Sequence, residues 1–512
     1  MRKEYQEGEL IMDKNIDKDL SSIFVIFGGT GDLTRRKLIP AIFSLMYEEK
    51  LPENFTIVAI GRREKTNEEY REEMYEYVEE FSRFTLDKDL WTKFSKRIFY
   101  KNFDFTSDNK GYVDLDLFLE AMEIKYSTGG KRLYYLAVAP EFFEGIIRNL
   151  KDNGMVCKAI GWQRIMIEKP FGSSLETARI LNHNISKLVP EEDLFRIDHY
   201  LGKEMIQNIL AIRFGNSLFE PLWNANYIDN IQITSNELLG VENRGTYYEN
   251  AGILKDMLQN HILQMLTMIA MEPPIDFEPE SIRDEKVKVL RSLRPFTAES
   301  FKENIVRGQY GEGEVEESKL LGYREENRVS FTSNTDTFIA LKTYIDNFRW
   351  GGVPIYIRAG KRMNNKSTEI VIQFKKLPGI NYYKEFNNIS HNLLVLKIQP
   401  DEGFFFQINA KKPGSEFKME KVQLDYCQSC RSLNDSPEAY ERLILEAIRN
   451  NSSLFTRWDE LQYSWEFIES IEKQYENNIP NYPNYSAGTS GPKEAIDLIK
   501  KDGRQWWNTA SD

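Results

Sequence analysis

The sequence predicts two kinds of architecture in succession, an α/β half and then an α+β half. Up to about residue 225, short apolar strand candidates alternate with helical segments, which predicts a doubly wound parallel sheet. Beyond that point many extended segments follow one another through short connections, which predicts a large, mainly antiparallel sheet flanked by helices. We therefore expect one domain at residues 1–198, with residues 1–20 as a flexible tail, and a second domain at residues 199–512.

The elements of the first half have the lengths of buried strands and of the helices that connect parallel strands. Alternation of this kind is typical of a Rossmann-like fold. The strand candidates are residues 23–27, 55–60, 133–138 and 164–167, and a helix is expected over residues 140–150.

The second half contains strand candidates with alternating or continuous apolar residues. Two long helical segments accompany them, one over residues 248–271 and one that starts at Ser436 and Pro437, a plausible N-cap and first helical residue. Residues 308–317 are expected to form an exposed acidic loop. The strand candidates are residues 228–234, 337–345, 353–357, 369–374, 392–398, 404–410 and 422–426.

Composition limits the classes of partner. The formal net charge of −12 over 512 residues argues against a general nucleic-acid surface, so basic groups that bind an anion should be concentrated in one pocket. The N-terminal residues lack the apolar core of a signal peptide, and no apolar run approaches the roughly 20 residues that span a bilayer. We expect a cytoplasmic protein with no membrane partner. Cys427 and Cys430 are expected to be reduced structural thiols.

A glycine-rich loop follows the first strand and precedes a helical segment. Glycines in this position let the backbone approach a pyrophosphate, which then sits at the helix N-terminus. The third glycine of the usual pattern is missing, so the loop alone is a weak signal, and its strand–helix context strengthens it. The residues of this expected dinucleotide site are Gly28, Gly29, Thr30, Gly31, Asp32 and Leu33.

The turn after the second strand carries Arg62 and Arg63. Sites specific for NAD usually place an acidic residue here, against the ribose 2′-hydroxyl, whereas NADP sites place arginine. A solvated basic turn is the alternative interpretation. We expect NADP, with Arg62, Arg63 and Thr30 at the 2′-phosphate, and NAD as a possible secondary coenzyme.

The run RIDHYLGKE at residues 196–204 places several donors around the start of a helix. Asp198 and His199 should lie at the end of an extended element, and Lys203 should open the helix. Helix N-termini offer free N–H groups, and His199, Tyr200 and Lys203 would add donors for a phosphate.

His261 is the candidate for a general base, because a dehydrogenase that acts on a hydroxyl must remove its proton as hydride leaves the carbon. Asp198 would accept the hydrogen on its Nδ1 atom. Asp256 lies five residues before His261, about 140° around an α-helix, so the two would flank a substrate and not share one face. Lys169 follows an apolar strand and should point into the crevice of the sheet. No metal is expected.

The sequence resembles the glucose-6-phosphate dehydrogenase family over nearly its whole length. The motifs occur in the family's order and at similar spacing, and RIDHYLGKE is close to a family signature. They are GGTGDL at 28–33, EKPFG at 168–172, RIDHYLGKE at 196–204, DMLQNHILQML at 256–266, RWGGVP at 349–354, RAGK at 358–361, KKPG at 411–414 and AYERLI at 439–444.

This resemblance implies oxidation of glucose 6-phosphate to 6-phosphoglucono-δ-lactone with hydride transfer to NADP, the first step of the oxidative pentose phosphate pathway. It also implies a homodimer or homotetramer built through the large sheet. His261 would be the base and Asp198 its partner, and His199, Tyr200 and Lys203 would bind the sugar phosphate. Further substrate contacts would be Lys169, Glu237, Asp256, Lys361 and Lys366, with Lys169 also beside the coenzyme.

Two other functions remain open from the sequence. A phosphosugar isomerase would need a base and a phosphate site but no dinucleotide loop. A non-catalytic dinucleotide sensor would need the loop, with His261 merely packed in the core.

Overall fold

The computed structural model describes residues 20–52, 54–106, 109–315, 318–377, 389–428, 430 and 436–507. The expected tail lies almost wholly outside this range. The chain forms two compact units. One comprises residues up to Ile167 with Leu188–Phe195 and Ile444–Asn450, and the other comprises Glu168–Lys187, Arg196–Leu443 and the residues from Asn451 onward. The domain boundary expected at residue 198 stays a prediction.

The first unit is built on a parallel six-stranded sheet with the order β3-β2-β1-β4-β5-β6. The chain moves outward from β1 to β3 and then returns to the other side of β1, which is the order of a Rossmann-like fold. The parallel doubly wound sheet is therefore confirmed. Its strands are β1 (Ile23–Phe27), β2 (Thr56–Gly61), β3 (Ile98–Asn102), β4 (Arg132–Leu136), β5 (Gln163–Ile167) and β6 (Leu194–Arg196).

Central strands of this sheet are buried along their whole length, which explains their continuous apolar sequence. All five residues of β1 are buried, and β1 coincides with its predicted range. The edge strand β3 is only alternately buried, and the sequence analysis did not identify it. The helical elements are η2 (Thr34–Leu38), α1 (Ile39–Tyr47), α2 (Asn67–Phe81), α3 (Lys88–Ser95), α4 (Asn109–Tyr126), η3 (Pro140–Phe142) and α5 (Phe143–Asp152).

The second unit contains an eight-stranded sheet with the order β17-β16-β15-β14-β7-β13-β12-β8. Neighbouring strands are antiparallel except β7 and β13, which are parallel. The expected large, mainly antiparallel sheet is confirmed. Its strands are β7 (Ile228–Asn236), β8 (Ile305–Gly308), β12 (Phe338–Thr343), β13 (Ile355–Gly360), β14 (Ser367–Phe374), β15 (Leu393–Gln399), β16 (Gly403–Lys411) and β17 (Met419–Cys427).

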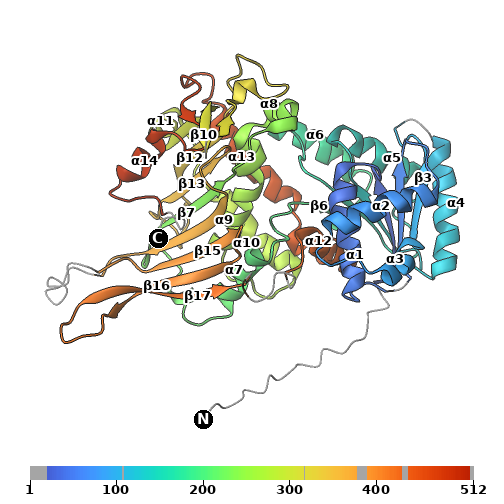
Figure 1. Cartoon of the computed structure of the whole chain (residues 1–512), viewed down its shortest axis with the longest axis horizontal. Helices are drawn as coiled ribbons and strands as arrows, with labels where there is room; N and C mark the ends of the chain where they lie inside the picture. The colour runs from blue at the N-terminus through green and yellow to red at the C-terminus, as the bar shows by residue number, and fades with distance from the viewer. Residues whose placement is uncertain are drawn as a thin grey trace, which may run out of the picture. The chain divides into compact units, whose positions relative to one another are not determined.

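Helices of this unit pack beside the sheet, with α7 on β15 and α9 against α7 and α10 (Figure 1). Two fully buried tryptophans fix the end of α9, because the indole N–H of Trp223 donates to the carbonyl of Ile269 and that of Trp350 to Ala270. The helices are α6 (Leu175–Ser186), α7 (Glu204–Phe214), α8 (Gly245–Ile253), η7 (Leu254–Ile262), α9 (Leu263–Ala270), α10 (Pro279–Arg291), α11 (Ala298–Asn304), α13 (Trp458–Glu472) and α14 (Lys493–Lys500), while α12 (Ala439–Arg449) has residues in both units.

Short elements complete the chain: the 3₁₀ turns η4 (Glu191–Asp193), η5 (Glu220–Leu222), η6 (Glu242–Arg244), η8 (Tyr323–Glu325) and η10 (Ser452–Leu454), and the strands β9 (Tyr310–Gly311), β10 (Gly313–Val315), β11 (Ser318–Leu320) and β18 (Tyr485–Ser486).

The acidic loop expected at residues 308–317 is wrong for most of its length. Strand β9 pairs with β18, and β10 forms a hairpin with β11. Tyr310 in β9 is buried in a core of aromatic side chains. The partner strand β18 lies about 175 residues away in sequence, so local composition gave no sign of the pairing. Residues 316–317 lie outside the described range.

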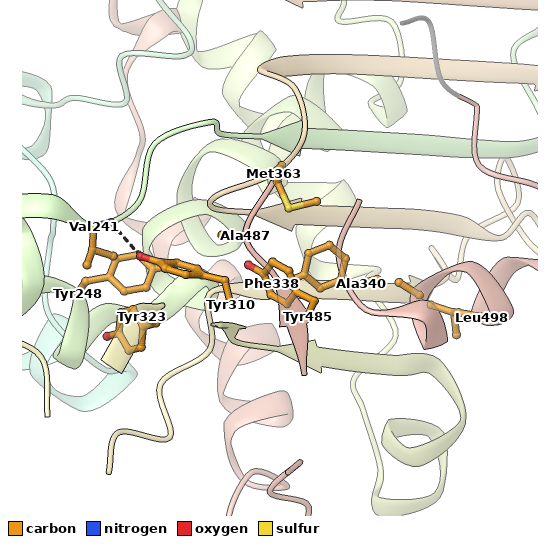
Figure 2. Packing of buried hydrophobic residues seen from close by; sticks show 11 residues of the cluster. Val241, Tyr248, Tyr310, Tyr323, Phe338, Ala340, Met363, Tyr485, Ala487 and Leu498 are labelled. Carbon is orange, nitrogen blue, oxygen red and sulfur yellow. Dashed lines mark hydrogen bonds between the residues drawn. The ribbon is translucent and has the colours of Figure 1, made fainter. Parts of the chain in front are cut away.

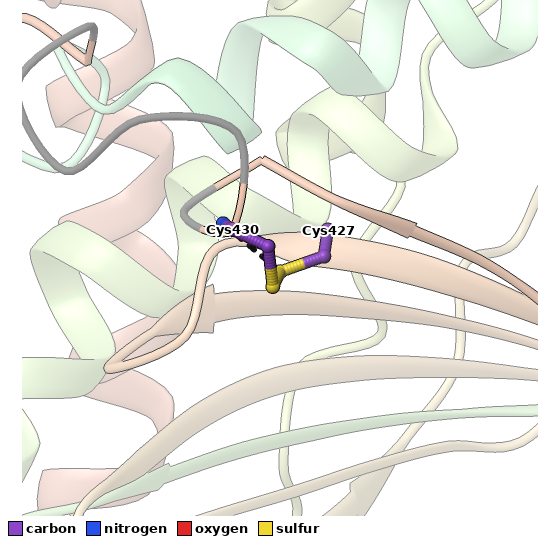
Figure 3. The surroundings of a disulfide bond; sticks show 2 residues. All are labelled: Cys427 and Cys430. Carbon is purple, nitrogen blue, oxygen red and sulfur yellow. Dashed lines mark hydrogen bonds between the residues drawn. A yellow bond between two sulfur atoms is a disulfide. The ribbon is translucent and has the colours of Figure 1, made fainter.

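The expectation of two reduced thiols is also corrected. Cys427 at the end of β17 forms a disulfide with Cys430 (Figure 3). The chain turns back after the strand, so the two Cα atoms lie 5.3 Å apart, within the range that a disulfide spans. Cys157 is free and exposed.

A search of the described residues for membrane spans finds no helix that combines enough length with enough apolar character to cross a bilayer.

Candidate active site

Strand β6 and helix α7 place the RIDHYLGKE segment as its sequence predicts. The strand ends at Arg196, and α7 begins at Glu204 with Lys203 as its N-cap residue. A tight turn joins them, in which the Leu201 N–H donates to the Asp198 carbonyl at 3.0 Å and the Lys203 N–H donates to the Tyr200 carbonyl at 3.0 Å. The side chains between the two elements are therefore held by a compact, hydrogen-bonded backbone.

His261 lies on the π-helix η7, and this corrects the expected geometry of Asp256 and His261. In a π-helix each N–H bonds to the carbonyl five residues earlier, so residues five apart lie on nearly the same face. The α-helical estimate of about 140° therefore does not apply. Gly252, with φ 57° and ψ −178°, forms a kink one residue before the end of α8, in a conformation that glycine alone adopts readily.

His261 and Asp198 form a buried hydrogen-bonded pair. The Oδ1 atom of Asp198 lies 2.5 Å from Nδ1 of His261 and also accepts the Tyr200 N–H at 3.0 Å. An ionised carboxylate can only accept, so Nδ1 carries the hydrogen and Nε2 is the free acceptor. Burial lowers the pKa of His261 although the carboxylate opposes this shift. Burial alone would raise the pKa of Asp198, but His261, with His199 and Lys169, brings it below its usual value.

Lys169 follows strand β5 and reaches the other nitrogen of His261. Its Nζ atom lies 2.5 Å from His261 Nε2 and donates to the Asp256 carbonyl at 3.2 Å. The ammonium group therefore occupies the position from which a hydroxyl could donate to the same nitrogen.

Asp256 is surrounded by cations and hydroxyl donors. Its carboxylate lies 3.3 Å from Nζ of Lys361 and 3.9 Å from Nζ of Lys169, and it accepts a hydrogen bond from the Tyr247 hydroxyl at 3.2 Å. Burial would raise the pKa of Asp256, but Lys361 and Lys169 lower it below its usual range. Lys361 also pairs with Glu237, and despite burial these two carboxylates raise the pKa of Lys361.

Aromatic side chains of a buried core contact Lys361. Figure 2 shows this cluster, in which the Tyr310 hydroxyl accepts the Val241 N–H at 3.2 Å. The Tyr485 hydroxyl donates to the backbone carbonyl of Lys361 at 2.8 Å, and the Tyr248 ring centroid lies 5.0 Å from its Nζ atom. The position of the ammonium group is thus fixed by packed rings from distant segments.

The ring of Tyr200 contacts both His261 and Lys203. This ring stacks on the imidazole with centroids 4.2 Å apart, and Nζ of Lys203 lies 4.6 Å from the ring centroid on a cation–π contact. His199 meets His261 edge-on at 4.7 Å. Burial lowers the pKa of Lys203 to about 8, although Glu402 opposes the shift.

Sequence reasoning missed two polar residues here. Gln399 bonds to the ammonium group of Lys203 and donates to the Tyr200 hydroxyl at 3.2 Å. Tyr247 holds Asp256, as described above. Gln399 lies about 200 residues from the motif that it contacts, and nothing in its local sequence signals the contact. Lys366 is exposed, but its charge contributes to the lowered pKa of Lys203.

The same residues include a group that could hold a metal ion. Among the residues that the structure describes, the ligand atoms of Asp198, His199 and His261 lie within 4.8 Å of one another. Asp198 Oδ1 and His261 Nδ1 already bond to each other at 2.5 Å, and Nε2 of His261 lies 2.5 Å from the ammonium group of Lys169, so both ring nitrogens have partners other than a metal.

The glycine loop of the first unit has the backbone shape expected for binding a dinucleotide. Gly28 has φ 91°, and a Cβ atom there would lie 2.2 Å from the Ala137 carbonyl oxygen. A Cβ atom on Gly29 would lie 2.7 Å from that of Ala59. Helical structure starts at Asp32, so the loop can bring a phosphate close to the N–H groups of the helix's first turn.

The second strand ends beside this loop. A Cβ atom on Gly61 would lie 3.3 Å from the Thr30 methyl group, so the loop and the end of β2 are in close contact. Arg62 and Arg63 follow and are exposed. The three residues expected at the 2′-phosphate therefore lie on one edge of the first unit.

Two family models match this chain. The model for the NAD binding domain of glucose-6-phosphate dehydrogenase matches residues 25–208, and the model for its C-terminal domain matches residues 210–507. Both halves of the sequence are thus covered.

Similar proteins share this assignment over nearly their whole length. Glucose-6-phosphate 1-dehydrogenase of Bacillus subtilis (strain 168) is 47% identical over 95% of this chain and 98% of its own, and that of Chlamydia pneumoniae is 45% identical over 94% and 95%. A solved structure of glucose-6-phosphate dehydrogenase in complex with its substrate glucose-6-phosphate is 36% identical, with a TM-score of 0.87 over 95% of this chain and 99% of that one. The structure of glucose-6-phosphate 1-dehydrogenase from Mycobacterium avium has a TM-score of 0.80 at 31% identity, covering 96% of this chain and 99% of that one. With the Rossmann-like sheet, the His261–Asp198 pair and these matches together, the chain belongs to the glucose-6-phosphate dehydrogenase family.

Proposed function

We propose that this chain oxidises glucose 6-phosphate at its C1 hydroxyl to 6-phosphoglucono-δ-lactone, with NADP as the preferred hydride acceptor. The observation that carries the proposal is the buried His261–Asp198 pair, whose free nitrogen Nε2 faces Lys169. Family membership supports the reaction, and the contacts around His261 support the roles proposed for the individual groups.

His261 removes the proton from the C1 hydroxyl in this mechanism. Nε2 is the acceptor because Nδ1 is already bonded to Asp198. Its lowered pKa keeps the imidazole neutral near pH 7, and the adjacent carboxylate stabilises the imidazolium that forms on proton transfer. The hydroxyl takes the place of the Lys169 ammonium at Nε2, and Lys169 then donates to a sugar oxygen. Hydride leaves C1 as the proton leaves oxygen.

Charged groups around this base orient the sugar. Asp256 and Glu237 accept hydrogen bonds from sugar hydroxyls, and Lys361 forms an ion pair with each of these carboxylates. At the other end, His199, Tyr200, Lys203 and Lys366 bind the phosphate. The contact between Lys203 and Gln399 keeps the ammonium group in place when no phosphate is bound.

The coenzyme, when bound, supplies the nicotinamide ring that accepts the hydride. The glycine loop suits its pyrophosphate, because helical structure starts at Asp32 directly after the loop and the N–H groups of a first helical turn can bind a phosphate. The residues that would hold the coenzyme are Gly28, Gly29, Thr30, Gly31, Asp32, Leu33, Arg62, Arg63 and Lys169. Exposed arginines after β2 favour NADP, since their charge pairs with the 2′-phosphate.

The test mixes the protein with glucose 6-phosphate and NADP and follows the absorbance of the reduced nicotinamide. His261→Asn should abolish turnover while leaving NADP affinity intact. Formation of a ketose phosphate without nicotinamide reduction would instead support an isomerase. Nucleotide binding without turnover of the unmodified chain would support a sensor.

Coenzyme choice needs separate measurements. Arg62→Ala should weaken NADP far more than NAD, and equal losses would remove its role at the 2′-phosphate. Side-by-side kinetics of the unmodified chain with both coenzymes establish the preference itself.

We also infer a homodimer or homotetramer built through the large sheet. Strand β17 is an edge strand of that sheet, and Leu424 on it is 55% exposed. Exposed apolar side chains on an edge strand favour association. Light scattering measures the mass in solution, and Leu424→Lys should shift it toward the monomer.

A further inference from the structure

A carboxylate on helix α2 ties together two segments that border the expected coenzyme site. Glu73 forms an ion pair with Arg35, which lies on η2 directly after the glycine loop. Its other oxygen lies 2.8 Å from Nζ of Lys65, in the turn that carries Arg62 and Arg63. Neither of these two cations belongs to the residues proposed above for the 2′-phosphate.

Further contacts place this carboxylate near the expected position of the 2′-phosphate. The Tyr100 hydroxyl donates to the Arg63 carbonyl at 2.6 Å and lies 2.6 Å from the point where a Cβ atom on Gly61 would sit. The Thr30 methyl group lies 3.3 Å from the same point. Burial and then the charge of Glu73 raise the pKa of Tyr100, whereas Arg63 lowers it. Glu73 and Arg63 thus act on one hydroxyl at the edge of the expected site.

Partial burial strengthens the interaction between the charge of Glu73 and a charge at the expected 2′-phosphate position. Its side chain is 17% exposed, and those of Arg35 and Lys65 are 18% and 23% exposed. Charges at such positions interact through an effective dielectric constant of about 20, well below that of water. A phosphate monoester carries a charge of about −1.5 to −2 at neutral pH, whereas the ribose hydroxyl of NAD carries none.

We propose that Glu73 limits the preference of this chain for NADP over NAD, by opposing the charge of the 2′-phosphate and by occupying Arg35 and Lys65. The proposal rests on the proposed function, because it assumes that both coenzymes bind at the glycine loop. Glu73 is a specificity residue and takes no part in proton or hydride transfer.

The first experiment compares kcat/KM for NADP and for NAD, at saturating glucose 6-phosphate, in the unmodified chain and in Glu73→Gln. We expect the NADP-to-NAD ratio to rise by about threefold to tenfold. The change should appear in KM for NADP, with kcat altered by less than about twofold. It should shrink at high salt, since screening weakens an electrostatic effect but not a purely structural one.

Two variants separate charge from fold. Glu73→Asp keeps the charge and should stay near the unmodified ratio. Glu80→Gln removes the same charge from an exposed position seven residues further along α2, about 10 Å away, and should also leave the ratio unchanged.

A second measurement uses inhibitors in place of coenzymes. Adenosine 2′,5′-bisphosphate and adenosine 5′-monophosphate differ only in the 2′-phosphate, so the ratio of their inhibition constants isolates that group. Glu73→Gln should tighten the bisphosphate alone. An unchanged or lower preference for the 2′-phosphate in Glu73→Gln would overturn the proposal, as would an equal rise in Glu80→Gln. If the unmodified chain does not reduce NADP with glucose 6-phosphate, the proposed function itself fails, and the two failures are thereby distinct.

Discussion

Replacement of Asp198 by asparagine should remove most of the activity while leaving the fold intact. Asparagine has nearly the same shape, so it can occupy the same buried position beside His261. Its amide group, however, can donate to Nδ1, which would move the ring hydrogen to Nε2. The nitrogen that must accept the substrate's proton would then already be protonated.

The size of this effect follows from the contacts at Asp198. A hydrogen bond to a charged group contributes about 1.5–3 kcal/mol, and the bond to Nδ1 at 2.5 Å becomes such a bond when the imidazolium forms. General base catalysis contributes about 10² to 10⁴ in rate. We expect kcat for Asp198→Asn to decrease by a factor of about 10² to 10⁴. KM for glucose 6-phosphate should change by less than about threefold.

The pH dependence of the residual activity gives a second readout. Asp198 raises the pKa of His261 against the lowering effect of burial. Without the carboxylate that pKa falls further, so the acid limb of the kcat profile should move to lower pH. Steady-state kinetics between pH 5 and pH 9 measure both quantities, and Asp198→Glu serves as the control that retains a carboxylate. A variant that keeps more than a third of kcat with an unchanged acid limb would refute the assignment of Asp198 and His261.

Three further outcomes are expected. KM for glucose 6-phosphate should rise about tenfold between pH 7 and pH 9, because Lys203 has a pKa of about 8 and loses its charge as pH rises through that value. The side chain in Lys203→Arg stays charged over this range, so the rise in KM should vanish in that variant. Gly252→Ala should lower the free energy of unfolding, measured by chemical denaturation, by about 1–3 kcal/mol, because alanine is strained at φ 57° and ψ −178°. A change below about 0.5 kcal/mol would contradict that reasoning. Removal of divalent metals with a chelator should leave activity unchanged, because both ring nitrogens of His261 already have partners, Asp198 and the ammonium group of Lys169. Activity that returns only on adding metal would reverse this conclusion.

Elements with strong local patterns were predictable from the sequence. The buried strand β1 has continuous apolar residues and coincides with its predicted range, and α7 starts directly after Lys203 as expected. The pairing of β9 with β18 was not predictable, because the two strands are far apart in sequence and each is only two residues long. Local composition reports burial and periodicity, but it does not report which distant strand supplies the hydrogen bonds.

In the candidate site, too, some features could be predicted from the sequence and others could not. His261 and Asp198 were paired from the chemistry that a base requires, and the structure brings them together. The relation of Asp256 to His261 was wrong, because the argument assumed an α-helix where the chain forms a π-helix. The apolar pattern of this segment fits an α-helix as well, so it gave no sign of the π-helical repeat.

The ring of Tyr200 contacts a group at each end of the proposed substrate site. The imidazole of His261 stacks on it at 4.2 Å, and the ammonium group of Lys203 lies 4.6 Å from its centroid. A packed ring is rigid, so the span between the proton acceptor and the cation is held nearly constant. With the proposed roles, this span sets a minimum distance between the substrate's reacting hydroxyl and its phosphate. A sugar phosphate in which the two groups are closer together than in a hexose 6-phosphate cannot engage both ends at once.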